Sequence, residues 1–284
     1  MQGRNAAMIE RYFPRYNPAK TQYAAALDRI VQPGATWLDI GCGRALSGDP
    51  ELNARLTQRA GHIVGCDRDP HLARHSTVRD LVLCDAGELP FESGTFDLVT
   101  ASMVAEHLRE PEKVFAEVAR VCTPNGTFIV FTPNKFNYAM LVARATPYAF
   151  HLFFKRFTHY LNRGKWESFE DDVFPTYYRA NTLGKLRRLM QAAGFDDVHV
   201  DRLSFAHSFG FIKPLYAASL LYERLIDRWP LDGLKADILA IGTKRPAAVR
   251  PILQPVVTRL ERPVRVAQAV SARESGRVVG DASR

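Results

Sequence analysis

The amino-acid sequence predicts an α/β protein built on a largely parallel sheet. The chain has 284 residues, enough to bury a sizeable core without metal ions or disulfides. Its composition, 46% hydrophobic and 24% charged, is typical of a folded protein and excludes a wholly disordered chain. Between residues 35 and 135, short apolar runs alternate with amphipathic segments. Such alternation is typical of strands and helices arranged around a parallel sheet.

The first element is an N-terminal helical cap over residues 1–34. Apolar residues recur at helical spacing in residues 24–27 and 30–31 before Pro33 and Gly34 end the run. Strands are then predicted for the runs TWLDI, HIVGCD, LVLCD, FDLVTAS and GTFIVFTP. Helices are expected between them, at residues 51–60 and 111–121. Pro111 followed by Glu112 favours a helix start, because proline suits the first turn and an acid suits its dipole.

An insertion rich in aromatic and basic residues follows at about 136–181. Long insertions between regular elements commonly carry function. A helix is predicted over residues 181–193, with Asn181 or Thr182 as its cap and Gly194 as its end. The strands VHVDRL and ADILAIGTK come last, separated by a helical stretch at 215–227. We take residues 35–245 as one domain.

Residues 246–284 are predicted to form a basic, mostly disordered tail. They hold seven arginines against three acidic residues, which is half of the net charge of +8. The remaining chain is therefore not basic enough to indicate a nucleic-acid partner.

The cysteines and the N-terminus indicate a cytoplasmic protein. Cys42, Cys66, Cys84 and Cys122 form no C-x-x-C pair, so reduced thiols are expected rather than a zinc site or a disulfide framework. No metal ligand set is predicted. The N-terminus has no apolar core of a signal peptide, and no run of 18 apolar residues occurs.

The most informative motif is LDIGCG, residues 38–43, in which a strand runs into Gly41 and Gly43. Glycines there allow a tight turn and let a nucleotide approach the backbone. The third glycine of a dinucleotide fingerprint is replaced by Leu46. In addition, the Asp39 carboxylate would repel a pyrophosphate and would favour a cationic ligand such as S-adenosylmethionine.

Acidic residues also end the next two strands. Asp67 follows the second strand and could accept hydrogen bonds from ribose hydroxyls, and Asp85 follows the third and could accept from the adenine amino group. Carboxyl ends of parallel strands lie along one edge, so Asp39, Asp67 and Asp85 are expected in a row. A row of acceptors suits a nucleoside and not a phosphate.

Taken together, these segments resemble the class I S-adenosylmethionine-dependent methyltransferases. The resemblance is to the small-molecule branch that includes quinone-biosynthesis and glycan- or lipid-associated enzymes. It covers about residues 35–135 and is carried by LDIGCG, GCD, CDAGELPFESGTFDLV, ASMVAEHL and VARVCTPNGTFIVFTPN. It implies a Rossmann-like seven-stranded sheet, mostly parallel with an antiparallel last strand and helices on both faces. It also implies S-adenosyl-L-methionine as the cofactor.

The resemblance implies roles for nine residues in holding the cofactor. Asp39, Gly41 and Gly43 would hold its methionine part, Asp67 the ribose, with Arg68 beside the adenine that Asp85 and Ala86 frame. Ala101 and Ser102 would offer backbone groups to the amino-acid end. The loop departs from many relatives at Arg44 and Ala45, where a small residue and a glycine are common, so its shape is left open.

His107 is the candidate general base, because it follows the fourth strand and histidine titrates near neutrality. Glu106 would orient it or bind the acceptor; alternatively, the two residues only shape a helix end. Acceptor-binding side chains are expected from the insertion: His159, Trp166, Tyr177, Tyr178 and Arg179. These aromatic residues could equally form the core of a lid.

The predicted function is methyl transfer to a small glycan, lipid or quinone-like acceptor. Peripheral contact with a membrane surface is a further expectation, because residues 147–157 and 209–225 interleave apolar and basic residues. Two alternatives remain open at this point: a nicotinamide-dependent oxidoreductase, and a non-catalytic protein that retains the fold. No oligomeric state is predicted.

Overall fold

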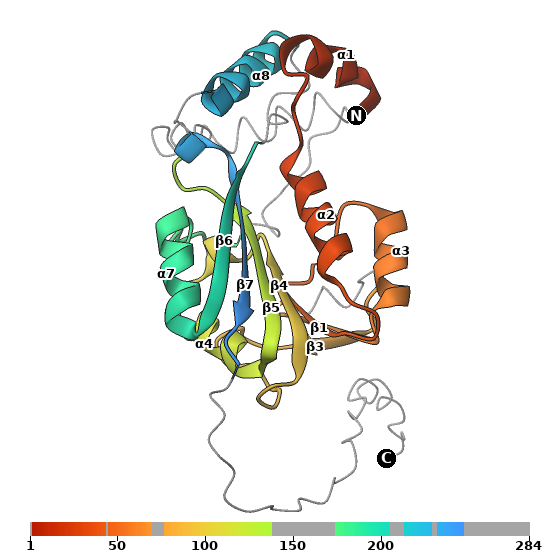
Figure 1. Ribbon diagram of the computed structural model, residues 1–284, viewed down its shortest axis with the longest axis vertical. Coiled ribbons are helices and arrows are strands. Elements are labelled where there is room, and N and C mark those ends of the chain that lie inside the picture. Colours follow the sequence, from red (N-terminus) through yellow and green to blue (C-terminus); the bar gives the residue numbers. More distant parts are fainter. Residues whose placement is uncertain are drawn as a thin grey trace, which may run out of the picture. The chain divides into compact units, whose positions relative to one another are not determined.

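A seven-stranded sheet is the centre of the fold (Figure 1). The computed structural model describes residues 2–43, 45–69, 77–137, 174–204, 213–228 and 232–246. The strands are β1 Thr36–Ile40, β2 His62–Asp67, β3 Asp80–Leu83, β4 Phe96–Ser102, β5 Cys122–Pro133, β6 Phe195–Leu203 and β7 Asp237–Lys244, in the spatial order β3-β2-β1-β4-β5-β7-β6. β1 to β5 pair in parallel, and β7 runs antiparallel to both β5 and β6. The expected sheet with an antiparallel last strand is therefore confirmed.

Helices cover both faces of this sheet. The helices within the described residues are α1 Gln2–Tyr12, α2 Ala19–Ile30, α3 Pro50–Arg59, α4 Pro111–Val121, α7 Leu183–Ala193 and α8 Lys213–Arg228, with short 3₁₀ turns η2 Ala105–His107 and η5 Asp232–Leu234. α2 and α3 pack on the face that carries Trp37 and Ile129. α4 and α7 pack on the opposite face, beside Phe128 (Figure 1).

Large buried side chains hold the two layers of helices on the sheet. Trp37 of β1 is fully buried under α2 and α3, and Phe115 of α4 meets Phe128 of β5 edge to face, with ring centroids 5.3 Å apart. Burying one such side chain contributes roughly 1.5–3 kcal/mol. The same packing fixes the direction of the strands, and therefore fixes which loops meet at their carboxyl ends.

Helix boundaries follow local capping chemistry. α4 begins at Pro111 as predicted. α3 begins at Pro50, one residue before the predicted start, because the Asp49 carboxylate accepts hydrogen bonds from the next free backbone N–H groups. For α7, the structure selects Thr182 over Asn181 as the cap, and Gly194 ends the helix with a φ of 99°.

Three strand boundaries differ from the prediction by two residues or more. β3 ends at Leu83, so Cys84 and Asp85 lie in the loop that follows it. β5 begins at Cys122 instead of residue 126, because Cys122 pairs with Phe96 before the strands shift register. β6 begins at residue 195 instead of 198. All three differences are at strand ends, where pairing with a neighbour decides the limit.

α1 and α8 pack together away from the sheet. Phe13 and Tyr16 form a small core with Tyr216 and Leu220 of α8. No helix in the described ranges is long and apolar enough to cross a membrane. The predictions for most of the insertion, at 138–173, and for the tail, at 247–284, lie outside the described residues.

Candidate active site

The candidate site lies at the carboxyl ends of β1, β2, β3 and β4. β1 and β4 are neighbours in the sheet, but the chain leaves β1 toward α3 on one face and leaves β4 toward α4 on the other. The two loops diverge at this point, where the strand order reverses, and open α/β sheets bind their ligands at such a point.

The glycine loop after β1 has a backbone that other residues would adopt only under strain. Gly41 and Gly43 have φ angles of 62° and 54°. A Cβ at position 41 would overlap the Cγ2 methyl of Val104. The Gly41 N–H donates to the Cys66 carbonyl at 2.7 Å, which ties the loop to β2. The loop therefore brings bare backbone to this edge of the sheet.

A buried carboxylate forms the floor beneath this loop. Asp39 is 4% exposed and accepts a hydrogen bond of 2.5 Å from the Thr100 hydroxyl, which in turn accepts from the Trp37 indole N–H at 2.8 Å. Burial raises the pKa of Asp39 to about 7 although the Thr100 bond opposes this, and Asp67 adds to the rise. A cationic ligand beside Asp39 would pair with its carboxylate and stabilise the ionised form of this group.

The Tyr23 hydroxyl comes from α2 to the same place. The Tyr23 ring stacks on Phe131 of β5, at 5.1 Å between centroids. Its hydroxyl lies beside those of Thr100 and Ser102 and near Asp39, but it is buried without a hydrogen bond of good geometry to any described residue. Burial raises the pKa of Tyr23 well above its usual value, so the group stays a proton donor. A buried donor without a partner is costly, and a ligand with an acceptor group would satisfy it.

Two acidic turns continue the edge of the site beyond β2 and β3. Asp67 Oδ1 accepts hydrogen bonds from the backbone N–H groups of Arg68 at 2.7 Å and Asp69 at 3.1 Å. These two turn contacts involve Oδ1 and not Oδ2. Arg68 Nε lies 3.7 Å from Asp85 Oδ2. The structure therefore brings Asp67, Arg68 and Asp85 together, as the sequence predicts.

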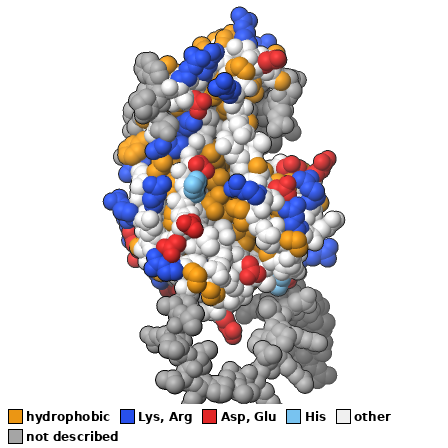
Figure 2. Space-filling view, viewed as in Figure 1, with side chains coloured by type: hydrophobic (Ala, Val, Ile, Leu, Met, Phe, Trp, Pro, Cys, Tyr) orange, Lys and Arg blue, Asp and Glu red, His pale blue; other side chains and the backbone are white. Residues whose placement is uncertain are grey.

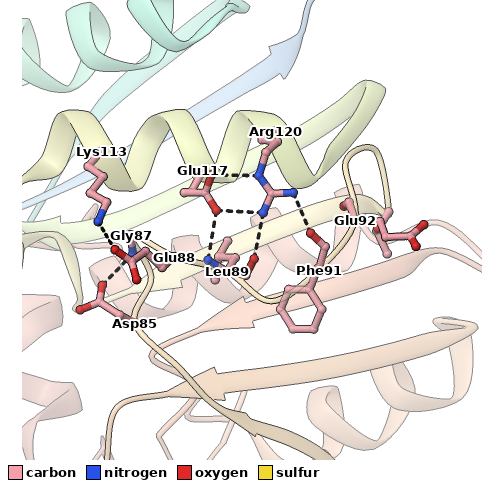
Figure 3. Close-up of polar contacts among 10 residues, drawn as sticks. Asp85, Gly87, Glu88, Leu89, Phe91, Glu92, Lys113, Glu117 and Arg120 are labelled. Atoms are coloured by element: carbon pink, nitrogen blue, oxygen red, sulfur yellow. Dashed lines mark hydrogen bonds and ion pairs between the residues drawn. The ribbon is translucent and has the colours of Figure 1, made fainter. Parts of the chain in front are cut away.

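The loop after β3 is fastened to α4 (Figure 3). The Arg120 guanidinium donates to the carbonyls of Phe91 at 2.7 Å and Leu89 at 2.9 Å, and to both carboxylate oxygens of Glu117. Glu117 also accepts from the Leu89 N–H at 3.1 Å. Asp85 Oδ1 closes the start of the loop by accepting from the Gly87 N–H, with Ala86 between them.

The strand β4 ends with regular pairing at Ala101 and Ser102, and the residue after it has a strained backbone. Ala101 is buried and pairs with both neighbouring strands, whereas Ser102 pairs with Phe131 alone. The next residue, Met103, has a φ of 58° and is 39% exposed. Such strain in a non-glycine residue is common at ligand sites.

Glu106 and His107 lie in the turn η2 after β4. His107 Nδ1 is 2.9 Å from the Pro175 carbonyl, which can only accept, so Nδ1 carries the proton and Nε2 has the free lone pair. Nε2 is 3.9 Å from Glu106 Oε1. Glu106 is 5% exposed, and its Oε2 accepts from the Thr132 hydroxyl at 2.9 Å. Burial raises the pKa of the Glu106 carboxyl, and His107 and Thr132 oppose the rise.

Three of the five predicted acceptor residues lie beside this pair. The backbone N–H groups of Tyr177 and Tyr178 donate to the Glu106 carbonyl at 2.7 and 3.1 Å, and the Tyr177 side chain is 43% exposed. Arg179 packs over the Tyr177 ring, at 5.8 Å to its centroid, and donates to the Arg109 carbonyl. The predictions for His159 and Trp166 lie outside the described residues.

Sequence reasoning missed the polar residues behind Asp39 and Glu106. Thr100 and Thr132 are buried strand hydroxyls, and Asn181 donates to Thr132 Oγ1 at 2.6 Å. The only signal in the sequence is a polar residue inside an otherwise apolar strand. Tyr23 of the N-terminal segment also reaches the site, whereas Tyr16 packs against α8.

Comparisons with known proteins agree with this geometry. A family model described as a methyltransferase domain matches residues 38–130. The chain is 33% identical to the demethylmenaquinone methyltransferase of Renibacterium salmoninarum, over 50% of this chain and 67% of that protein. It is 28% identical to a Mycolicibacterium smegmatis protein named as a probable S-adenosylmethionine-dependent methyltransferase, over 77% of each chain. Against other curated relatives, the chain spans only 35% to 54% of their length.

The fold is similar to that of a chain in a solved complex from Haloferax volcanii. That complex is described as one between the Trm112 methyltransferase activator and a presumed methyltransferase. The match covers 86% of this chain and 94% of that chain, with a TM-score of 0.50 and 17% identity. The chain belongs to the class I S-adenosylmethionine-dependent methyltransferases, and its cofactor is S-adenosyl-L-methionine.

Proposed function

We propose that the protein methylates a small acceptor that carries an ionisable ring hydroxyl, as quinone precursors do, with His107 as general base. The observation that carries this proposal is the 2.9 Å contact of His107 Nδ1 with the Pro175 carbonyl. It fixes the tautomer whose Nε2 can take a proton. A relative named demethylmenaquinone methyltransferase supports the class of acceptor.

The residues along the sheet edge fit the cofactor, which supplies an already activated methyl group on a sulfonium. Asp39 and the backbone of Gly41 and Gly43 would hold its amino-acid part, together with Ala101 and Ser102. Asp67 would accept from the ribose hydroxyls. Arg68, Asp85 and Ala86 would surround the adenine. The protein's main contribution to rate is then orientation, which can supply about 7–11 kcal/mol in favourable cases.

His107 Nε2 would receive the hydroxyl proton of the acceptor. Loss of that proton makes the ring electron-rich, whether the methyl group goes to oxygen or to ring carbon. Glu106 Oε1, 3.9 Å away, would stabilise the imidazolium that forms. The backbone N–H groups of Tyr177 and Tyr178 hold the Glu106 main chain in place. We assign Tyr177, Tyr178 and Arg179 to the contact with the acceptor ring.

The test is a panel of acceptors incubated with S-adenosylmethionine, with S-adenosylhomocysteine production as the readout. Hydroquinones and catechols should give turnover, while their fully O-methylated analogues should give none. Turnover only with amines, or with methylated rings, would contradict the ring-hydroxyl proposal. Cofactor binding without turnover of any acceptor in the panel would favour the non-catalytic alternative.

Replacing Tyr23 by phenylalanine should separate its role in folding from its role in binding. The ring stack on Phe131 is kept, and the hydroxyl has no well-formed hydrogen bond to lose. The free energy of unfolding of the apoprotein should therefore change by less than about 1 kcal/mol, or increase. The affinity for S-adenosylhomocysteine should fall about five- to tenfold, because one hydrogen bond to the amino-acid part is lost.

The control ligand for Tyr23→Phe is 5′-methylthioadenosine, which lacks the amino-acid part. Calorimetric titration should give the same Kd for this ligand in the variant and the wild type. A lower melting temperature with unchanged affinity for S-adenosylhomocysteine would instead assign the hydroxyl to folding alone.

Cofactor affinity should rise with pH between about 5 and 7. A cation bound beside Asp39 favours its ionised form, so the pKa of about 7 in the apoprotein must fall in the complex. Below pH 7, binding then releases a proton, and each unit of pH increases affinity by up to about tenfold. Titrations with S-adenosylhomocysteine across this range measure the slope. Asp39→Asn should flatten it, and an equally steep slope in this variant would assign the proton to another group.

A further inference from the structure

The helix α8 exposes an apolar face that the fold of the domain does not use. Its buried face includes Tyr216, Leu220 and Ile226, of which Tyr216 and Leu220 pack against α1 and the residues that follow it. On the outer side, Leu215, Leu221 and Leu225 are 43%, 47% and 48% exposed. Amphipathic helices of folded domains normally place polar residues there. α8 is thus apolar on two sides.

Helical geometry divides the exposed side of α8 into two rows. At 3.6 residues per turn, Pro214, Ala218, Leu221 and Leu225 line up along one row, with Leu215 at its edge. All five are exposed. From Pro214 to Leu225 the row runs for about 16 Å along the helix, at about 1.5 Å per residue.

The second row is basic and lies directly beside the apolar one. It contains the exposed Lys213 and Arg228 and the half-buried Arg224, which donates to the Tyr12 carbonyl at 3.3 Å. All three fall within a narrow arc of the helical wheel next to Leu221. The acids of α8 are elsewhere: Glu223 is on the buried face, and Asp227 pairs with Lys235 at 2.6 Å. Figure 2 shows basic and hydrophobic side chains side by side over the region of α1 and α8. The exposed surface of α8 therefore combines leucines with positive charge.

We propose that this face of α8 binds the surface of a membrane that contains anionic lipid. The leucines would enter the boundary between headgroups and acyl chains, and the basic row would lie among the lipid phosphates. The charge favours this occupant over an uncharged protein surface, because a row of cations beside an apolar row complements an anionic interface. The proposal does not depend on the identity of the methyl acceptor.

The test is co-sedimentation of the full chain with phospholipid vesicles. We expect binding to vesicles of phosphatidylcholine mixed with phosphatidylglycerol, weaker binding to phosphatidylcholine alone, and release at high salt. The double variant Leu221→Glu/Leu225→Glu should reduce the bound fraction by at least about fivefold. Both side chains are exposed, so the melting temperature and the affinity for S-adenosylhomocysteine should stay those of the wild type.

The matched control is Gln191→Glu/Ala192→Glu, which adds the same charge at exposed positions of α7. It should sediment with the mixed vesicles as the wild type does. The proposal is wrong if the wild type stays in solution with both kinds of vesicle, or if the α8 variant sediments unchanged. It is also wrong if sedimentation velocity shows a dimer that the α8 variant alone converts to monomer, because the face would then bind a second copy of the chain.

Discussion

His107→Ala should lower kcat by about two to four orders of magnitude, the usual contribution of a general base. The affinity for S-adenosylhomocysteine should change by less than about threefold, because His107 lies in η2 and not on the strand ends assigned to the cofactor. Single-turnover rates and calorimetric titration measure the two quantities. The loss should be largest for acceptors whose hydroxyl is least acidic, because those depend most on a base.

His62 offers a matched control for this variant. It is an exposed histidine at the start of β2, where it contacts Asp80 at 2.8 Å, at the opposite end of the strand from Asp67. His62→Ala should leave kcat unchanged. Glu106→Gln should give an intermediate loss, because the amide can still accept from Thr132 but cannot balance an imidazolium. Wild-type turnover in His107→Ala would remove the residue from the mechanism.

Asp67→Ala should weaken binding of S-adenosylhomocysteine by roughly two to four orders of magnitude. Two charge-assisted hydrogen bonds to ribose would be lost, at about 1.5–3 kcal/mol each. The variant also removes Oδ1, which holds the turn through the N–H groups of Arg68 and Asp69. Isothermal calorimetry with the purified protein measures the effect.

Asp67→Asn separates these two contributions. Its amide oxygen can still accept from the turn, so the backbone should be kept while the charge is lost. Its affinity should fall between those of the wild type and Asp67→Ala. Asp80→Ala, at the opposite end of the adjacent strand, is the control and should bind normally. Equal affinities for wild type and Asp67→Ala would show that the ribose is held elsewhere.

Local sequence was sufficient for much of the fold. Pro111 marks the start of α4 and Gly194 the end of α7, because each residue restricts its own backbone. The positive φ angles of Gly41 and Gly43 were likewise indicated by residue type, because such a turn favours glycine. These local features could be predicted from residue type and spacing, whereas the roles of the site residues toward the cofactor stay predictions.

Features that depend on distant partners could not be predicted. Cys122 pairs with Phe96 of β4, and the register shifts before the next paired residues of the two strands. The sequence around Cys122 therefore did not indicate that β5 begins there. The Thr100 bond to Asp39 joins positions 61 residues apart, and the contact of His107 with Pro175 joins positions 68 apart. Periodicity carries no information about such contacts. The tautomer of His107 therefore became evident only in the folded chain.

The Arg120 contacts shown in Figure 3 have a consequence for the thermodynamics of cofactor binding. They fix Leu89 and Phe91 to α4 through backbone carbonyls, and the Asp85 carboxylate holds the start of the same loop by accepting from the Gly87 N–H. An adenine ring arriving there meets a loop whose conformational entropy has already been lost on folding. Nucleoside recognition at this edge should therefore be close to rigid docking, and backbone amides of the loop should exchange hydrogen slowly even in the apoprotein.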